Sequence, residues 1–436
     1  MQLRALRPFR SLRLVFPRHA AAIVLLCVLA LNVVMRGIVP ALSHVDSDFP
    51  SYFTAARIVA DGAGTERLYD TAWFQEQMRR YRIGKPSAGK FAPLPPPTAL
   101  LLLPLASLQP LEALRVVTVV STLCLLASIV GLAAILEWSA IDAALLVLLS
   151  GSAVLSALRL GQPYILVSTS CILAYYAYLR NRPWLAGAGF GLFTPLKYFP
   201  VIFLGYFAFR RRWRVVAGGA LVIAAVTLAS IAILGWQVHA RFLASVLGNH
   251  LIARIDMQDP FAASFQSFDT LFRRLFVFDA TANPRPVLDA PLLQLTGVLL
   301  TKGALAAVAL LTLRRLAIRR AAQATAPSLG LLGIASMLLA PATATYHQVL
   351  LWLPVGLLSA FLLRERAHAC AAFLLGIYTL IGFFPYRLAA PFAGRGALTL
   401  LAFPRLLLLL AMFLGCVRCL WKLADTPSAA RAEVRA

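Results

Sequence analysis

Apolar stretches of about 17 to 25 residues recur along most of the chain, with shorter polar connections between them. A bilayer core about 30 Å thick needs roughly 20 residues of helix to cross it, so each stretch predicts a membrane-spanning helix. The expected helices lie near residues 19–41, 98–136, 141–159, 163–179, 215–236, 291–313, 327–341, 346–363, 369–385 and 397–417. With two short helices in 183–209, the pattern predicts an all-α polytopic bundle of about twelve transmembrane helices, with both termini in the cytoplasm.

Three parts of this pattern need a closer interpretation. Residues 98–136 contain Pro104 and Pro110, so they form either one span with a re-entrant lead-in or two short helices. Residues 183–209 begin and end at basic clusters, and the break at Thr194-Pro-Leu-Lys197 predicts two short helices that dip and return. The first apolar stretch continues through Leu42, which is too long for a cleaved signal sequence and indicates a retained helix.

Two long polar loops interrupt the apolar pattern, at about 42–97 and 237–290. The first holds six and the second five of the 17 acidic residues. The topology above places both loops on the external face, and segments 54–62 and 70–82 are expected to be helices on the membrane surface. We therefore expect one integral-membrane domain over 1–425, followed by a short disordered cytoplasmic tail at 426–436.

The net charge of +24 could indicate nucleic acid as a partner, but the basic residues cluster at the ends of apolar segments. That distribution follows the positive-inside rule and suits anionic membrane lipids, so no nucleic acid is expected. None of the six cysteines falls in the two long loops, and no disulfide framework is expected. Cys416 and Cys419 have CxxC spacing without a second pair or a nearby histidine, which argues against a metal or redox site.

The segment 44–57 concentrates polar chemistry in a chain that is 60% hydrophobic and 13% charged. It contains His44, Asp46, Asp48, Tyr52 and Arg57, directly after the first apolar helix. A carboxylate close to low-dielectric surroundings gains affinity for protons, which suits a general base acting on a hydroxyl group. The alternatives are a solvated loop acid or the N-cap of a helix that starts near Pro50.

Several motifs, taken in order, resemble glycosyltransferase family 87, a family of membrane transferases of the GT-C class that use polyprenyl-phosphate sugars. The resemblance rests on Asp48-Phe-x-x-Tyr52-x-x-Ala55-Ala56-Arg57, Leu68-Tyr69-Asp70, Pro95-Pro96-Pro97 with Leu103-Pro104-Leu105-Ala106, Gly161-Gln162, Lys197-Tyr-Phe-Pro200 with Arg210-Arg-Arg-Trp-Arg214, Phe265-Gln266-Ser267 with Arg273, and Thr345-Tyr346-His347. Around Gln266 and His347 the chain departs from the patterns common in that family, which bears on the acceptor more than on the fold.

The resemblance implies an inverting glycosyltransferase that moves a sugar, mannose being the first expectation, from a polyprenyl-phosphate donor to a lipid or glycan acceptor. Asp48 matches the catalytic acid of the family, and Asp46 is its nearest rival. Such a reaction needs a base for the acceptor hydroxyl and donors that stabilise the leaving phosphate. No cofactor is expected, and a divalent metal is not expected either, because a monophosphate donor offers no diphosphate to bridge.

His347 is expected to contact the phosphate or to carry a proton, because it lies at the start of a helix, where the dipole favours anions. The alternative is a structural histidine. Lys197 is a cation in an apolar region and so should pair or face a ligand, or else extend to the interface. The remaining substrate-binding candidates are Tyr52, Gln162, Gln266, Arg273 and Asp46.

A second hypothesis is a transporter or flippase of lipid-linked sugars or small solutes that uses the same polar residues. Transporters place ionisable groups near the membrane midplane, whereas here most acids lie in the two loops, which favours the enzyme. The chain has no Walker P-loop, HExxH or Gly-rich dinucleotide loop, and no βα alternation that would hold a soluble nucleotide sugar. The expected location is the bacterial plasma (inner) membrane, with the active site on the external or periplasmic face.

Overall fold

A computed structural model describes residues 19–46, 48–84, 89–251, 259–321 and 323–425. Within these ranges the fold is all-helical, and the only β pairing is a single bridge between Asp279 and Asn283. The tail 426–436 lies outside the described residues.

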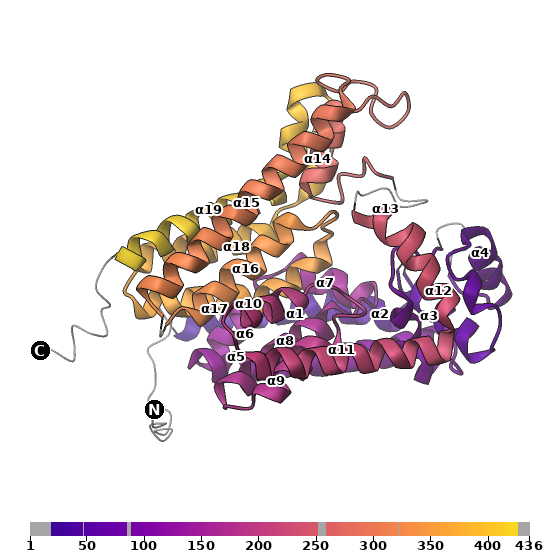
Figure 1. The fold of residues 1–436 in the computed structure, drawn as a ribbon, viewed down its shortest axis with the longest axis horizontal. Helices are drawn as coiled ribbons and strands as arrows, with labels where there is room; N and C mark the ends of the chain where they lie inside the picture. Colours follow the sequence, from indigo (N-terminus) through magenta and orange to yellow (C-terminus); the bar gives the residue numbers. More distant parts are fainter. Residues whose placement is uncertain (1–18, 47, 85–88, 252–258, 322, 426–436) are drawn as a thin grey trace, which may run out of the picture.

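The helices follow the apolar stretches of the sequence closely. The first half of the chain contains α1 (His19–Val33), α2 (Val39–Ser43), α3 (Phe49–Ala60), α4 (Thr71–Arg80), α5 (Pro110–Leu136), α6 (Ala140–Leu148), α7 (Ser152–Arg159), α8 (Tyr164–Leu179), α9 (Pro183–Leu192) and α10 (Val201–Phe209). The second half contains α11 (Trp213–Leu234), α12 (Trp236–Arg241), α13 (Leu247–Leu251), α14 (Phe268–Phe276), α15 (Pro291–Arg319), α16 (Thr325–Leu339), α17 (Trp352–Arg364), α18 (His368–Phe383) and α19 (Pro404–Asp425). In Figure 1, α15–α19 form an upper layer over α5, α8, α9 and α11.

Six helices in the described part of the chain are long and apolar enough to cross a membrane, or eight if each of two bent helix pairs is one span. This confirms a polytopic membrane protein but does not confirm the expected count of about twelve. The difference arises because helices such as α8 and α16 are apolar but have only 16 and 15 residues. The two bent pairs are α6 with α7, at 73°, and α18 with the turns at Tyr386–Phe392, at 70°.

The two ambiguous stretches take definite forms. Residues 98–136 become two short 3₁₀ turns, η4 (Pro96–Leu100) and η5 (Leu103–Leu105), followed by the single long helix α5, whose first residue is Pro110. Proline suits that first position because its missing N–H has no partner there in any helix. Residues 183–209 split into α9 and α10 around the expected break, which holds Lys197.

Glycine contacts fix the position of α9. A Cβ atom on Gly187 would lie 2.0 Å from the carbonyl oxygen of Val215, and one on Gly191 would lie 2.6 Å from that of Gly219. Such small-residue faces let two helix backbones approach closely without a hydrophobic driving force between them. The contact between α9 and α11 therefore fixes the end of α9, where the break that carries Lys197 begins.

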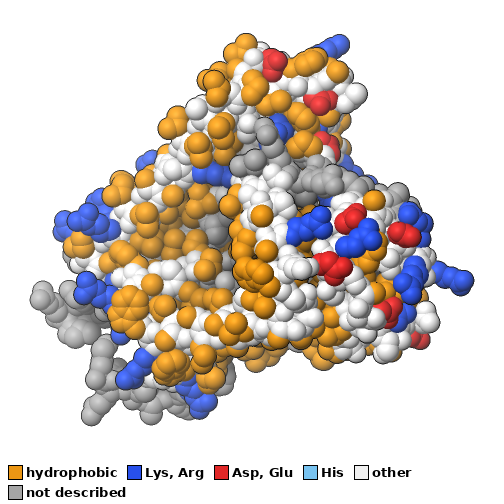
Figure 2. Space-filling model, turned by 45° about the vertical axis from the view of Figure 1, so that its right-hand side comes forward, with side chains coloured by type: hydrophobic (Ala, Val, Ile, Leu, Met, Phe, Trp, Pro, Cys, Tyr) orange, Lys and Arg blue, Asp and Glu red, His pale blue; other side chains and the backbone are white. Residues whose placement is uncertain are grey.

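The acidic residues are unevenly distributed over the surface. On the face shown in Figure 2, the left end carries Lys and Arg side chains without Asp or Glu, hydrophobic side chains cover the middle, and Asp and Glu side chains lie at the right and top together with further Lys and Arg. In Figure 1, α3 and α4 of the first loop lie at the right and α14 of the second loop at the top, whereas α19 ends at the left. These elements of the two long polar loops thus lie away from the end of the molecule at which α19 ends.

The expectation of no disulfide is wrong. Cys370, near the start of α18, and Cys419, near the end of α19, are joined by a disulfide across 49 positions of sequence. Two consecutive helices that pack side by side bring the start of the first close to the end of the second. Sequence spacing alone does not reveal that pairing, because both cysteines look like ordinary members of apolar runs.

Candidate active site

Asp48 and Tyr52 lie one helical turn apart at the start of α3. Residues four positions apart share one face of a helix. Beside them Phe49 and Phe53 are fully buried and stack with ring centroids 5.5 Å apart, which anchors this turn in the core. Asp48 occupies the N-cap position, but its side chain makes no capping hydrogen bond. The capping interpretation of Asp48 therefore fails, and its carboxylate points elsewhere.

The carboxylate instead accepts a hydrogen bond from Gln162, whose Nε2 lies 2.7 Å from Asp48 Oδ2. Gln162 directly follows Gly161, which ends α7 with a left-handed φ of 60°. The amide of Gly161 donates to Leu158 and that of Gln162 to Ala157, the paired bonds of a Schellman helix end. The Gly161-Gln162 motif thus stops the helix and delivers the amide side chain to Asp48.

Lys197, in the break between α9 and α10, completes the cluster. Its Nζ lies 2.9 Å from the hydroxyl of Tyr52. It also lies over the rings of Tyr52 and Tyr164, 5.3 and 4.9 Å from their centroids. Burial lowers the pKa of Lys197 to about 7, while the nearby Asp48 carboxylate acts to raise it. This cation has the polar and aromatic partners that a charge in an apolar region needs.

These contacts form a directed chain from the cation to the carboxylate. Lys197 donates to Tyr52, the Tyr52 hydroxyl donates to Gln162 Oε1 at 2.8 Å, and Gln162 donates to Asp48. Burial raises the pKa of Tyr52 well above its usual value, so the phenol keeps the proton that it donates. Hydrogen bonds that run in one direction polarise one another. The chain therefore couples the charge at Lys197 to the basicity of Asp48.

Tyr164, Tyr346 and His347 form the opposite wall of the cluster. The hydroxyl of Tyr346 forms a hydrogen bond with Asp48, and its ring stacks on Tyr164 with centroids 5.4 Å apart. His347 lies in the turn η7 (Thr345–Leu351), which leads into α17. Its Nδ1 accepts from the amide of Ala344 at 2.8 Å, so in the neutral ring Nε2 carries the proton and donates to the Tyr164 hydroxyl at 2.7 Å. Asp48 and His347, about 300 positions apart in sequence, thus meet in one cluster.

The structure separates the two candidate carboxylates. Asp46 forms an ion pair with Arg159 at 2.9 Å, and their side chains are 29% and 48% exposed. Asp48 lies two residues further along, at the N-cap of α3, among tyrosines and an amide. Asp46 thus has a charged partner near solvent, whereas the surroundings of Asp48, neutral side chains with Lys197 beyond them, suit a base.

A family model agrees with the resemblance in the sequence. The model of glycosyltransferase family 87 matches residues 94–341, more than half of the chain. The chain belongs to glycosyltransferase family 87. No curated protein and no solved structure matches it.

The matched segment covers the cluster only in part. Gln162 and Lys197 lie inside residues 94–341, whereas Asp48, Tyr52 and His347 lie outside them. Family membership thus supports a glycosyltransferase, and the matched segment does not test the roles predicted for Asp48, Tyr52 and His347.

Gln266 and Arg273 are placed differently from the other candidates. The amide nitrogen of Gln266 donates to the carbonyl oxygens of Ala263 and Ala402, and its oxygen accepts from the backbone of Arg405. None of these partners belongs to the Asp48 cluster. Arg273 is buried in α14, close to Asp269. A substrate role for these two residues of the family 87 chain stays a prediction.

Three residues near the site were not among the site candidates from the sequence. Tyr164 begins an apolar run, where an aromatic side chain is expected in the core, and Tyr346 entered only as part of the Thr345-Tyr346-His347 motif. Arg405 begins α19 and is 4% exposed. Its guanidinium donates to Thr345 Oγ1 at 2.7 Å and to Ser152 Oγ at 3.0 Å. It thereby ties the turn that carries Tyr346 and His347 to two neighbouring helices.

Among the described residues, no group of three or more His, Cys, Asp or Glu side chains could hold a metal ion. The Asp46–Ser47–Asp48 pattern does not converge, because Asp46 pairs with Arg159 while Asp48 faces Gln162. Metal-independent transfer remains a prediction for this member of family 87.

Proposed function

We propose that this family 87 glycosyltransferase moves a sugar, mannose first among the candidates, from a polyprenyl-phosphate donor to a hydroxyl of a lipid or glycan acceptor. In this reaction Asp48 takes the proton of the acceptor hydroxyl. The acceptor oxygen forms a bond to the anomeric carbon from the side opposite the phosphate. The bond from that carbon to the phosphate oxygen breaks, and the phosphate leaves with the electron pair, which inverts the configuration.

The observation that carries this proposal is the hydrogen-bonded chain from Lys197 to Asp48. It puts a cation and a carboxylate in one half-buried cluster, separated by Tyr52 and Gln162. Transfer from a phosphate needs both groups, because negative charge develops on the leaving phosphate while a proton leaves the acceptor. Lys197 is the donor suited to the phosphate, His347 can join it only by exchanging its hydrogen bond to Tyr164 for one to the phosphate, and Asp48 is suited to the acceptor.

The separation of charge on the surface supports a location of the site. By the positive-inside rule, we assign the cytoplasmic side to the end that carries Lys and Arg without acidic residues, so the end with the two acidic loops and the Asp48 cluster faces outward. In this proposal the polyprenyl donor reaches the cluster from the bacterial inner membrane. Membrane lipids are therefore partners of the helical body as well as a source of substrate.

The transporter alternative receives no support from the site. Membership of family 87 indicates a transferase. Eleven of the 17 acidic residues lie in the two long loops, whereas transporters place ionisable groups near the membrane midplane.

The donor class can be tested with purified protein in nanodiscs and radiolabelled sugars. The protein is incubated with polyprenyl-phosphate mannose or GDP-mannose, together with a lipid and glycan extract of the host. Transfer from the lipid-linked donor alone would support the proposal. Transfer from the nucleotide sugar alone would refute it, as would the absence of transfer from the polyprenyl donor over a panel of lipid-linked sugars.

A further inference from the structure

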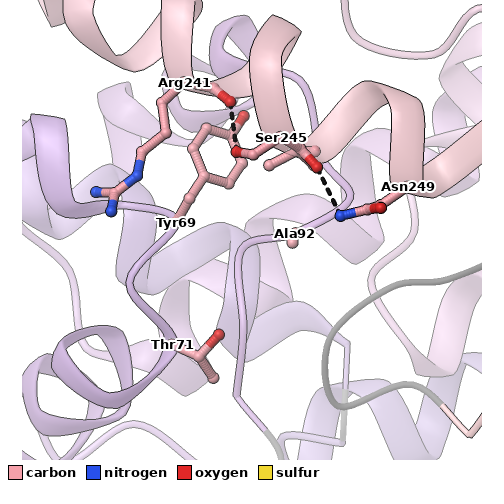
Figure 3. A pocket seen from close by; sticks show the side chains of 7 residues that line it. Tyr69, Thr71, Ala92, Arg241, Ser245 and Asn249 are labelled. Atoms are coloured by element: carbon pink, nitrogen blue, oxygen red, sulfur yellow. Dashed lines mark hydrogen bonds between the residues drawn. The ribbon is translucent and has the colours of Figure 1, made fainter.

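A second polar site lies between the first loop and the segment that follows α11. It is a cavity of about 230 Å³, lined by Tyr69, Thr71, Ala92, Arg241, Ser245, Val246 and Asn249. Figure 3 shows Arg241, Ser245 and Asn249 descending from the helical segment, with Thr71 and Ala92 of the first loop across the cavity. Its volume is below the roughly 300–1,000 Å³ of pockets for drug-sized ligands, which suits a single ring.

The helix geometry presents this polar face. Arg241 ends α12, and the π-helical turn η6 (Phe242–Val246) carries Ser245 before α13 begins. π-Helical turns are rare and occur frequently at functional sites. Ser245 Oγ donates to the carbonyl of Arg241 at 2.7 Å, and Asn249 Nδ2 donates to that of Ser245 at 2.8 Å. These bonds hold both side chains in place against the helix.

The lining matches the chemistry of a polyol. The bonds just described use the hydroxyl proton of Ser245 and one of the two N–H groups of Asn249, so the hydroxyl oxygen, the amide oxygen and one amide N–H remain for a ligand. The exposed Arg241 supplies several N–H donors. Sugar hydroxyl groups both donate and accept, and therefore satisfy such a mixed set. The charged rim makes the cavity unsuited to the apolar chain of a polyprenyl donor.

Tyr198 and His250 connect the cavity with the Asp48 cluster. Tyr198 is close enough to interact electrostatically with the hydroxyls of both Tyr69, in the cavity wall, and Tyr164, in the cluster. Its ring lies 6.4 Å from that of His250, which directly follows Asn249 and interacts with Lys197. His250 Nδ1 is buried without a hydrogen-bond partner in the described part of the chain. A polar nitrogen left unpaired in this way is suited to a ligand that passes between the two sites.

We infer that this cavity binds a polyol ring of the acceptor and orients its hydroxyl groups toward the Asp48 cluster. The inference rests on the proposed function and extends it, since it separates the acceptor subsite from the phosphate-binding side at Lys197. The ring can belong to a lipid headgroup or to a soluble glycan, which share the same hydroxyl chemistry.

The test uses the full-length protein in nanodiscs, a fixed excess of radiolabelled polyprenyl-phosphate sugar, and two acceptor preparations. These are the lipid fraction and the water-soluble glycan fraction of the host. The variants are Arg241→Gln, Asn249→Ala and their combination. Arg79→Gln is the matched control, because Arg79 is an exposed arginine of the first loop that does not line the cavity. The fraction that supports transfer by the wild type identifies the source of the ring.

The double variant is expected to raise the KM for the acceptor about tenfold or more, because each lost contact removes a polar partner of the ligand. The maximal rate and the KM for the donor should stay unchanged, as should all constants of Arg79→Gln. An unchanged acceptor KM in folded, active variants would overturn the inference and leave the proposed function intact. So would a changed donor KM, or a loss of maximal rate without a change in KM. A wild type inactive with every lipid-linked donor would refute the proposed function itself, and the inference with it.

Discussion

The substitution Gln162→Leu removes the middle link of the hydrogen-bonded chain from Lys197 to Asp48 and changes the side-chain volume little. Gln162 is 3% exposed and joins Asp48 to Tyr52 through bonds of 2.7 and 2.8 Å. Leucine removes both, so the Asp48 carboxylate loses one donor and the buried Tyr52 hydroxyl loses its acceptor. A hydrogen bond to a charged group contributes about 1.5–3 kcal/mol.

If that bond orients Asp48 in the transition state, its loss should lower kcat/KM by about 10- to 150-fold, at about 1.36 kcal/mol per factor of ten. The assay measures initial rates of sugar transfer at several acceptor concentrations, and thermal unfolding in detergent shows that the variant is folded. Gln77→Leu is the matched control, since Gln77 is 7% exposed in α4. A folded Gln162→Leu protein with wild-type kcat/KM would refute the idea that the chain positions the base.

Three further outcomes are expected. Burial lowers the pKa of Lys197 to about 7, so the cation is mostly present at pH 6 and mostly lost at pH 8. The KM for the donor should therefore rise up to about tenfold from pH 6 to pH 8 in the wild type and stay constant in Lys197→Arg. A wild-type donor KM that does not change with pH would contradict the role of Lys197. Gly161→Ala should lower both the thermal stability and the rate of transfer, because φ at this residue is 60° and the new Cβ would lie 2.8 Å from Phe49 Cδ2. Gly205→Ala is the control and should be tolerated, because a Cβ atom at Gly205 would meet no other atom within 4 Å. Arg405→Met should destabilise the fold by about 2–4 kcal/mol by leaving buried partners unpaired, measured by unfolding against the exposed control Arg387→Met; equal stability of the two would contradict the role assigned to Arg405.

The helices could be predicted from the sequence because a membrane helix makes all its backbone hydrogen bonds internally and is therefore recognisable from a long run of apolar residues. The break that holds Lys197 was also predictable. Residues 183–209 have a basic cluster at both ends, and the positive-inside rule then excludes a single crossing of the membrane. The number of spans was not, because short apolar helices such as α8 and α16 have the composition of spans without their length.

The candidate site was predictable where polar residues stand out against an apolar background, as Asp48, Gln162 and Lys197 do. Tyr164 was missed because a tyrosine in an apolar run usually serves the core. Tyr346 was part of the Thr345-Tyr346-His347 motif, but only the fold shows that its hydroxyl faces a carboxylate. Gln266 stood out equally well, yet it bonds to the backbone at the start of α19. A polar residue in an apolar region signals a partner, and the sequence does not say whether that partner is substrate or protein.

The most direct test of the central claim compares Asp48→Asn with Asp46→Asn in the same transfer assay. Both substitutions remove one carboxylate from the same turn and keep the size of the side chain. General-base catalysis contributes about 10²–10⁴-fold, so Asp48→Asn is expected to lose transfer by at least the lower factor. Asp46→Asn, which breaks only the exposed pair with Arg159, is expected to stay within a few-fold of the wild type. Full activity of Asp48→Asn, or a greater loss in Asp46→Asn, would contradict the assignment of Asp48 as the base.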